Sequence, residues 1–277
     1  MNRFIIIAIS VLVFTSCNSR KSEEDAADGK IALIKTLIAE NKLNEAKTEI
    51  DSLHALYPRL INKRKDAVAL KDTIILRESN RTLKYCSKIL PELFKTVKEF
   101  EKEFVFKKDE KYENIGKYTY KTQLSEQNTT KSYLACEVDE NHDLYLTSKY
   151  VGSKLNHYAI KVQTSAGLTA QTDSLNNKAG VFHAYNIESN NIEQLTFKNE
   201  SDGGIVKFIH ENQRMDIKIT LIGNKKHNYT LSSANKVAIS KTYAFASALR
   251  LLKKTENESR IAQQRIGKIK LLYNINN

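Results

Sequence analysis

Two periodicities divide the apolar positions of this 277-residue chain. Over residues 30–106, and again over 232–277, apolar side chains recur at spacings of three and four, which predicts helices. Between them, over 107–231, apolar and polar residues alternate in short runs separated by Asn- and Gly-containing turns, which predicts strands. We therefore expect an α+β fold in which helical regions flank a β domain.

The first helical region begins with a predicted hairpin over residues 30–57. Two apolar faces lie on either side of a polar turn, Glu40–Lys42, and Pro58 ends the second helix because proline disfavours helical backbone in the residue before it. The spacing is similar to a single tetratricopeptide repeat. One copy cannot stack into a solenoid, so we expect a local helix pair.

The two helical regions also carry long apolar seams, one along residues 83–104 and one along 245–273. We expect them to pair as an antiparallel, coiled-coil-like stalk with the β domain at its tip, or to fold back over the sheet as a helical layer. Pro91 interrupts the first seam and predicts a kink or break near residues 87–90.

The alternating region predicts an antiparallel β-sandwich or a curled sheet, because its short connections leave no room for crossover helices. About nine strands are expected, over residues 118–122, 132–138, 144–151, 158–162, 181–187, 193–197, 204–209, 216–222 and 228–231.

The N-terminus predicts export. Arg3 precedes an apolar run, Phe4–Phe14, that is too short to cross a bilayer, which needs roughly 20 residues. We interpret residues 1–16 as a cleaved signal peptide. The sequence Phe-Thr-Ser-Cys ending at Cys17 resembles the lipobox of bacterial lipoproteins, which implies that Cys17 carries acyl chains; an ordinary signal peptide with a chance cysteine is the alternative. Residues 17–29 predict a flexible tether, because they are small or charged.

The acidic cluster Glu23–Asp25 resembles the surface-export signal of Bacteroidota lipoproteins. This resemblance implies a lipid-anchored protein of the outer membrane, on the periplasmic or the cell-surface side, with the surface favoured. A solvated linker without any targeting role is the alternative interpretation.

Composition narrows the partners. The formal net charge of +12 is spread along the chain, which favours solubility or long-range attraction to an anionic polysaccharide. No nucleic-acid-binding motif accompanies the charge, so nucleic acid is not an expected partner. Cys86 and Cys136 fall in separate predicted regions, too far apart for a disulfide, and are expected to be buried free thiols.

No motif predicts catalysis or a metal. The six histidines are scattered, and Asp139–Asp143 begins like a calcium loop but lacks its glycine and its final glutamate, so a polar hairpin turn is expected. We predict no catalytic residue, metal or cofactor, and no enzymatic activity. Exposed aromatic residues are the candidates for contacts with a glycan: Tyr145, Tyr150, Tyr158 and Tyr185.

Three Asp-Ser/Thr-apolar triplets resemble the O-glycosylation sequon of Bacteroidota. They predict modification at Ser52, Thr73 and Ser174, although a triplet of this kind also occurs by chance.

Residues 51–58 (DSLHALYP), 103–113 (EFVFKKDEKYE) and 229–234 (YTLSSA), together with the lipobox, give the chain its resemblance to a family of uncharacterised lipoproteins from Bacteroidales. The resemblance implies a location but no activity. We expect a membrane-anchored, non-enzymatic interaction or structural module that binds a protein or polysaccharide through surface loops 139–143 or 199–204. A glycan- or small-ligand-binding module is the alternative function. A hydrolase is the third hypothesis, and its sign would be a deep polar pocket that holds paired carboxylates or a buried histidine.

Overall fold

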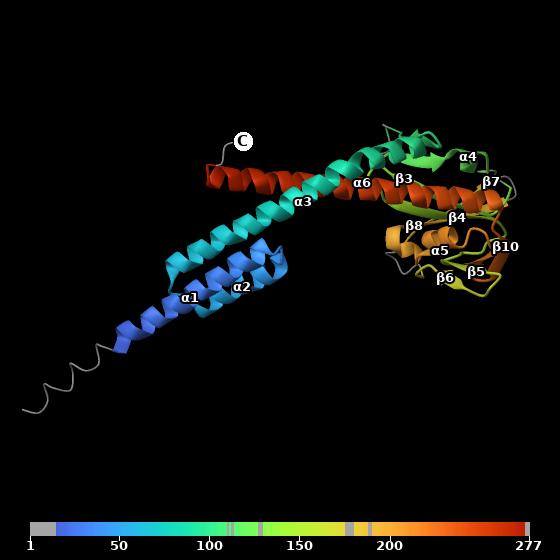
Figure 1. Ribbon diagram of the computed structural model, residues 1–277. Helices are drawn as coiled ribbons and strands as arrows, with labels where there is room; N and C mark the ends of the chain where they lie inside the picture. Colours follow the sequence, from blue (N-terminus) through green and yellow to red (C-terminus); the bar gives the residue numbers. More distant parts are fainter. Residues whose placement is uncertain are drawn as a thin grey trace, which may run out of the picture. The chain divides into compact units, whose positions relative to one another are not determined.

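The computed structural model describes residues 15–109, 111, 114–126, 130–174, 180–187 and 190–274 (Figure 1). The chain forms two compact units: unit 1 comprises Met1–Lys88 with Glu256–Asn277, and unit 2 comprises Ile89–Thr255. Two long helices, α3 (Ile61–Glu101) and α6 (Ser233–Leu272), each contribute to both units. The expected α+β class is confirmed. The predicted boundaries at residues 106 and 232 follow secondary structure, whereas the compact units divide both long helices.

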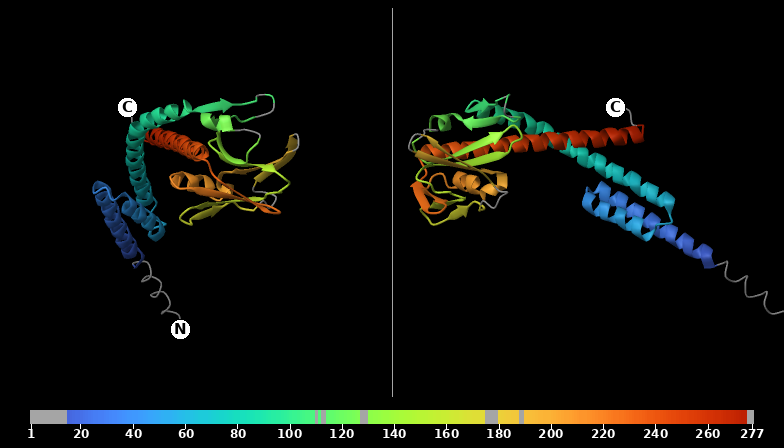
Figure 2. Two further views of the ribbon diagram at one scale, coloured as in Figure 1. Left: turned by 90° about the vertical axis from the view of Figure 1, so that its right-hand side faces the viewer. Right: turned by 180° about the vertical axis from the view of Figure 1, so that it is seen from behind.

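Unit 1 contains the predicted helical hairpin, formed by α1 (Thr15–Ala39) and α2 (Leu43–Leu56) (Figure 2). Asn41 makes the tight turn between them with a left-handed backbone, φ 60°. Apolar residues of both helices pack with the first turns of α3 in one core: Ile31, Ile34, Leu37, Ile38, Ala46, Ile50, Leu53, Ala67 and Ile74. The hairpin is therefore confirmed, and α3 covers it.

The flexible tether expected over residues 17–29 is wrong, because these residues continue α1. Ala27 is fully buried, Asp28 pairs with Lys63, and Lys30 lies 2.5 Å from Glu49. Alanine buries a small face without producing an apolar run, so the sequence of this segment looked unstructured. Residues 1–14 of the predicted signal peptide lie outside the described residues. Among the helices that the structure describes, none has a stretch apolar and long enough to cross a membrane.

The predicted antiparallel pairing of α3 with α6 is confirmed. In unit 1 the Tyr273 hydroxyl donates to Asp72 Oδ2 at 2.9 Å, so the end of α6 lies beside the beginning of α3. In unit 2 the Phe100 and Phe245 ring centroids are 5.7 Å apart, so the end of α3 lies beside the beginning of α6. Helix α3 continues through Pro91, so of the predicted kink or break the break is wrong, and the kink stays a prediction. Packing of the flanking turns offsets the one backbone hydrogen bond that proline removes.

Unit 2 contains two antiparallel sheets. The six-stranded sheet has the order β1-β2-β3-β4-β8-β7 and the four-stranded sheet the order β10-β9-β5-β6. The strands are β1 (Phe104–Lys107), β2 (Lys117–Tyr120), β3 (Tyr133–Asp139), β4 (Leu144–Gly152), β5 (Ala159–Thr164), β6 (Thr169–Gln171), β7 (Gly180–Ile187), β8 (Asn190–Lys198), β9 (Ile217–Ile222) and β10 (Lys226–Thr230). The sequence did not predict β1 and β6. A short helix, α4 (Lys121–Glu126), follows β2, and a 3-10 turn, η1 (Asn199–Asp202), follows β8.

The strand expected at 204–209 is wrong, because the chain forms helix α5 (Ile205–Glu211) there. The Asp202 carboxylate accepts hydrogen bonds from the N–H groups of Gly204 and Val206 at 2.8 and 2.9 Å and caps the helix. Gly203 and Gly204 supply the left-handed backbone that turns the chain into it. The apolar residues at 205, 206, 208 and 209 have helical spacing, which the alternation count missed.

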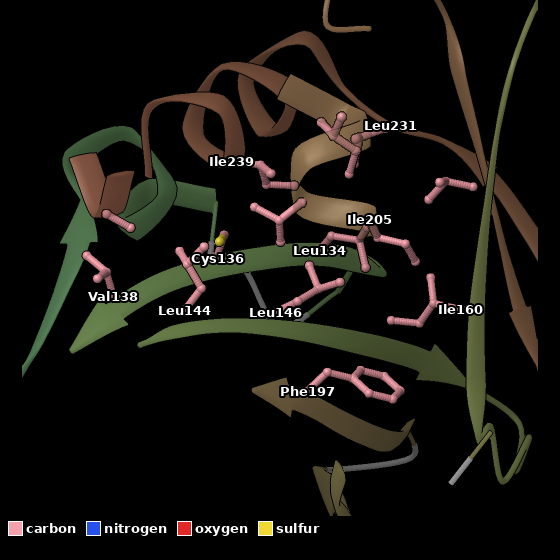
Figure 3. Packing of buried hydrophobic residues seen from close by; sticks show 14 of the residues in the cluster. Leu134, Cys136, Val138, Leu144, Leu146, Ile160, Phe197, Ile205, Leu231 and Ile239 are labelled. Atoms are coloured by element: carbon pink, nitrogen blue, oxygen red, sulfur yellow. The ribbon is translucent and has the colours of Figure 1, made fainter. Parts of the chain in front are cut away.

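The core of unit 2 lies between the sheets, α5 and the first half of α6 (Figure 3). Ile239 of α6 packs toward Leu134 and Cys136 of β3, and the Thr242 hydroxyl lies 3.4 Å from the Cys136 carbonyl oxygen. The first half of α6 therefore lies over the sheet, as the alternative prediction of a helical layer expected for both helices. Cys86 and Cys136 are both buried and form no disulfide with each other, as predicted, and burial raises the pKa of the Cys136 thiol well above its usual value.

Candidate functional site

The predicted modification sites lie in separate elements. Cys17 belongs to α1, and its side chain lies outside the described part of the structure. Ser52 is half-buried on α2, Thr73 is exposed on α3, and Ser174 is exposed after β6. The Thr73 hydroxyl donates to the Ala69 carbonyl at 3.1 Å. The structure therefore does not bring these residues together, and modification remains a prediction for each.

The two loops predicted to carry binding lie side by side. Asn199 Nδ2 donates to Asp143 Oδ1 at 2.8 Å, and the N–H of Leu144 donates to Asn199 Oδ1 at 2.9 Å. Arg250 of α6 donates to the His142 carbonyl and to Asn199 Oδ1, each at 2.8 Å. These bonds hold both loops against the helix, and binding through them stays a prediction.

The turn at 139–143 is the predicted polar hairpin turn between β3 and β4. Asp139 Oδ1 accepts the backbone N–H groups of Asn141 and Asp143 at 2.8 and 2.9 Å, and Oδ2 accepts the Tyr145 hydroxyl at 2.9 Å. Both carboxylate oxygens therefore shape the turn. Within the described residues, no group of three or more His, Cys, Asp or Glu side chains is placed to hold a metal ion.

Glu193 forms the centre of a buried polar cluster that the sequence did not predict. Its Oε1 accepts the N–H groups of Leu155 and Asn156 at 2.7 and 2.8 Å, and its Oε2 accepts the N–H of His157 at 3.0 Å. The imidazole Nδ1 of His157 lies 2.8 Å from the same Oε2. Burial opposes ionisation of Glu193, but these hydrogen bonds outweigh it and leave the carboxyl pKa below its usual value.

His157 links this carboxylate to Ser148 of β4. Burial lowers the pKa of the imidazole although Glu193 opposes the shift, so His157 is neutral at pH 7. The ionised carboxylate places the imidazole proton on Nδ1, and Nε2 then accepts the Ser148 hydroxyl at 3.2 Å. The order serine, histidine, carboxylate is that of acyl-transfer triads. The relative exposures are 0% for Ser148, 1% for His157 and 0% for Glu193, so the hydroxyl is closed to a substrate.

The cluster has a structural role that follows from its position. The segment from residue 153 to 158 carries the chain from β4 of one sheet to β5 of the other, and Glu193 binds three consecutive N–H groups of this segment. Within this segment the N–H of Tyr158 donates to the Ile222 carbonyl of β9, and the Glu193 carboxylate supplies the acceptors for the three N–H groups before it. The sequence signal was available, because Glu193 alternates with the buried Leu195 and Phe197 and so points into the core.

One site in unit 2 that is open to a ligand is a groove of about 650 Å³ with a mixed polar and apolar lining. We call it the β10 groove. It lies between the beginning of β3, the end of β4, the edge strand β10 and the beginning of α6. Its lining residues are Thr130, Lys131, Ser132, Tyr133, Val151, His227, Tyr229, Thr230, Ser232 and Asn235. The groove therefore combines two tyrosine rings with hydroxyl, amide and basic groups.

The wall of the β10 groove carries an unsatisfied donor. The Tyr229 hydroxyl oxygen is buried and has no hydrogen-bond partner among the described residues. Burial raises the pKa of Tyr229, so its hydroxyl keeps its proton at any physiological pH. A buried hydroxyl without a partner costs about 1–3 kcal/mol.

Two aromatic contacts hold the groove side of β10. The ring centroids of His227 and Tyr150 are 4.9 Å apart, and those of His227 and Tyr229 are 5.9 Å apart. Ser132 Oγ accepts the N–H of Val151 at 3.1 Å and fixes the opposite wall. The walls are thus positioned without using the nitrogens of His227 or Lys131, which have no hydrogen-bond or ion-pair partner among the described residues.

The aromatic residues expected to contact a glycan do not form this groove. Tyr150 is buried, Tyr145 is half-buried, and Tyr158 and Tyr185 are exposed elsewhere. The groove instead uses Tyr133 and Tyr229, which alternation alone could not separate from core tyrosines. No protein-family model, curated protein or solved structure matches this chain, so its function is inferred from this geometry and from the sequence.

Proposed function

We propose that this chain is an exported, lipid-anchored binding protein, attached to the outer membrane through Cys17 and holding a small polar ligand in the β10 groove. The anchor proposal rests on the lipobox-like sequence that ends at Cys17. The binding proposal rests on one observation, a groove of about 650 Å³ that is lined by tyrosine, hydroxyl, amide and basic side chains. Surface exposure is favoured by the acidic cluster Glu23–Asp25.

A glycan is the ligand class that the lining supports best. Sugars present hydroxyl groups that both donate and accept, and their ring faces pack on aromatic side chains. Tyr133 lines the groove together with Ser132, Thr230 and Ser232, and the ammonium group of Lys149 lies 5.4 Å from the centroid of the Tyr133 ring. A volume of about 650 Å³ lies in the range of small-molecule sites, roughly 300–1,000 Å³.

The proposal describes a binder and not a catalyst. The Ser148–His157–Glu193 cluster has the order of a catalytic triad, but all three side chains are buried and none of them lines the β10 groove. A buried histidine, the feature expected of a hydrolase, is therefore present as His157, but the serine beside it is not accessible to a substrate. This arrangement supports a role in folding.

Binding is tested with the lipidated protein in detergent against a panel of neutral and acidic cell-surface oligosaccharides, followed by thermal unfolding and calorimetry. We expect at least one member to bind and Tyr133→Ala to weaken that binding. The matched control is Tyr158→Ala, which removes a tyrosine of 43% relative exposure outside the groove. Equal losses in both variants, or no binding by any member, would contradict the groove proposal.

The anchor is tested by labelling expressing cells with radioactive palmitate. The wild-type chain should incorporate label and fractionate with membranes, and Cys17→Ala should do neither. Digestion of intact cells with an added protease reports the side of the membrane. A Cys17→Ala chain that stays in the membrane fraction would overturn the anchor while leaving the groove untouched.

A further inference from the structure

Strand β7 ends the six-stranded sheet and leaves one side of its backbone open (Figure 1). The strand pairs with β8 in antiparallel register, from Gly180 opposite Phe197 to Ile187 opposite Asn190. Outside this pairing, no backbone hydrogen bond joins β7 to another described residue. Every residue from 181 to 187 except Phe182 is exposed, as expected of an uncovered edge. Such an edge presents N–H and C=O groups that can pair with a further strand.

Strand β7 also lacks the features that keep edge strands from pairing. Its sequence, GVFHAYNI, contains no lysine, arginine, aspartate, glutamate or proline, which are the residues that block an edge. The other described edge strands differ, because β1 contains Lys107, β10 contains Lys226, and β6 has only 3 residues. Strand β7 has 8 residues, and its Val181, Tyr185 and Ile187 are 56%, 41% and 40% exposed. Among these edges it is therefore the one best suited to accept a strand.

The sequence of β7 identifies a second copy of the chain as the strand that fits it. In an antiparallel pair about a twofold axis, residues at equal distances from the axis lie opposite each other. With Ala184 on the axis, Val181 lies opposite Ile187 and His183 lies opposite Tyr185, each pair occurring twice. Aliphatic side chains thus meet aliphatic ones and aromatic rings meet aromatic rings. Cross-strand pairs of this kind stabilise adjacent strands.

The charges behind the edge do not oppose this pairing. On one face, the residues of β8 that lie opposite β7 are uncharged: Ile192, Gln194 and Thr196. On the other face, Glu193 lies opposite Ala184, and its carboxylate is buried and bound to the backbone of the crossing segment. Two β7 edges can therefore approach without placing like charges against each other.

We propose that β7 is a self-association edge, through which two copies of the chain pair in antiparallel fashion with Ala184 at the twofold axis. The two six-stranded sheets then continue into one another across the dimer. A single pair of strands is a small interface, so the dimer is weak and depends on concentration. This inference goes beyond the proposed binding of a ligand, because no residue of β7 is among those that line the β10 groove.

Cysteine cross-linking of the full-length chain in detergent, under mild oxidation, tests the pairing and its register together. Opposite residues of an antiparallel pair have Cα atoms about 4.5–5.5 Å apart, which a disulfide can bridge. Ala184→Cys should therefore form a linked dimer about tenfold more completely than Val181→Cys. The latter is the matched control, because the two copies of residue 181 would lie roughly 20 Å apart along the strands. Mixing Val181→Cys with Ile187→Cys should restore the link.

Sedimentation of the same full-length chain measures the association directly. The wild type should change from monomer to dimer between about 1 and 100 µM. Val181→Lys should raise the dissociation constant about tenfold or more, because it places a lysine on each of the two edges. Leu168→Lys is the matched control, since it adds the same charge at a residue of 53% exposure in the turn before β6, and it should leave the constant unchanged. Circular dichroism verifies that both variants are folded.

Several results would overturn the self-association edge. One is a wild-type chain that stays monomeric throughout this concentration range, and another is a dimer that Val181→Lys leaves intact. Equal cross-linking of Ala184→Cys and Val181→Cys would contradict the register. A dimer that dissociates as salt is raised would contradict an uncharged interface. In intact cells, a disulfide from Ala184→Cys to a different protein, without the linked dimer, would assign the edge to another partner. None of these results touches the groove, whose Tyr133 dependence is measured separately.

Discussion

Replacing Glu193 with alanine should destabilise unit 2 more than any change at an exposed carboxylate. The substitution removes the acceptor of three backbone N–H groups and of the His157 imidazole, at distances of 2.7 to 3.0 Å. Each buried donor left without an acceptor costs about 1–3 kcal/mol. Relaxation and entering water reduce the sum of these costs to about 3–5 kcal/mol, which is at the upper end of what single substitutions cost. We expect a loss in this range from the free energy of unfolding, against about 5–15 kcal/mol for a whole domain.

The assay must report unit 2 alone, because two compact units do not guarantee one cooperative transition. Amide hydrogen exchange, read by mass spectrometry for β5 and β8, gives the opening free energy of these strands. The control is Glu211→Ala, whose carboxylate lies 3.7 Å from Lys207 with side-chain exposures of 57% and 61%. A surface pair of this kind is worth about 0–1 kcal/mol, so exchange should hardly change.

Glu193→Gln tests whether the loss of stability depends on the number of acceptors removed. Glutamine keeps one oxygen that can accept two of the N–H groups, but its amide nitrogen faces the donors that Oε2 served, so the loss should lie between wild type and alanine. If Glu193→Ala left the exchange of β5 and β8 within about 1 kcal/mol of wild type, the cluster would not hold the crossing segment. Equal losses in glutamine and alanine would refute the reasoning about individual acceptors.

Three further predictions concern pH, the unpaired hydroxyl and backbone strain. Burial holds the pKa of folded His157 below the unfolded value of about 6.5, so the unfolded chain gains a proton first as pH falls, and the free energy of unfolding should decrease between pH 7 and 5. Urea unfolding at both pH values measures this decrease, with His157→Gln as the comparison. No decrease in the wild type would contradict the prediction. Without ligand, Tyr229→Phe should raise the free energy of unfolding by about 1 kcal/mol, since it removes a buried hydroxyl without a described partner, and a loss of stability would show that the hydroxyl is paired. Gly203→Ala should lower the free energy of unfolding by about 2 kcal/mol or more, because the added Cβ would lie 1.9 Å from the carbonyl oxygen of Gln171. At Gly204 an added Cβ meets no atom within 4 Å, so Gly204→Ala should cost only about 1 kcal/mol for its left-handed backbone. Equal melting temperatures of the two variants would contradict the predicted clash at Gly203.

Elements with a strong, repeated period were predicted from the sequence. The two long helices and the hairpin follow from apolar spacings of three and four, and the strands from alternation, because these periods decide which side chains reach a core. The failures are short elements. Helix α5 was predicted as a strand because six residues hold too little periodicity to decide, and the Asp202 cap outweighed their strand-forming composition.

The beginning of α1 failed for a different reason. Residues 17–29 are small or charged, yet Ala27 is fully buried and its neighbour Asp28 pairs with Lys63 of α3, which is distant in sequence. Ion pairs from Asp28 and Lys30 reach residues 63 and 49, so the helix is stabilised by tertiary contacts that no local pattern contains. Local composition therefore predicted a tether where packing produces a helix.

The unpaired hydroxyl of Tyr229 could not be predicted, because its defining feature is the absence of a partner for one atom among the described residues. In sequence, Tyr229 is an ordinary aromatic residue of an alternating strand, and phenylalanine would satisfy the same pattern. The hydroxyl distinguishes the two, and without a partner it destabilises the fold. Ser79 of unit 1 has a second such hydroxyl, in a cleft that also contains Glu78, Glu258 and Arg265. An unpaired buried hydroxyl is therefore not by itself a binding site, and the β10 groove has to be tested through the side chains that are open to it.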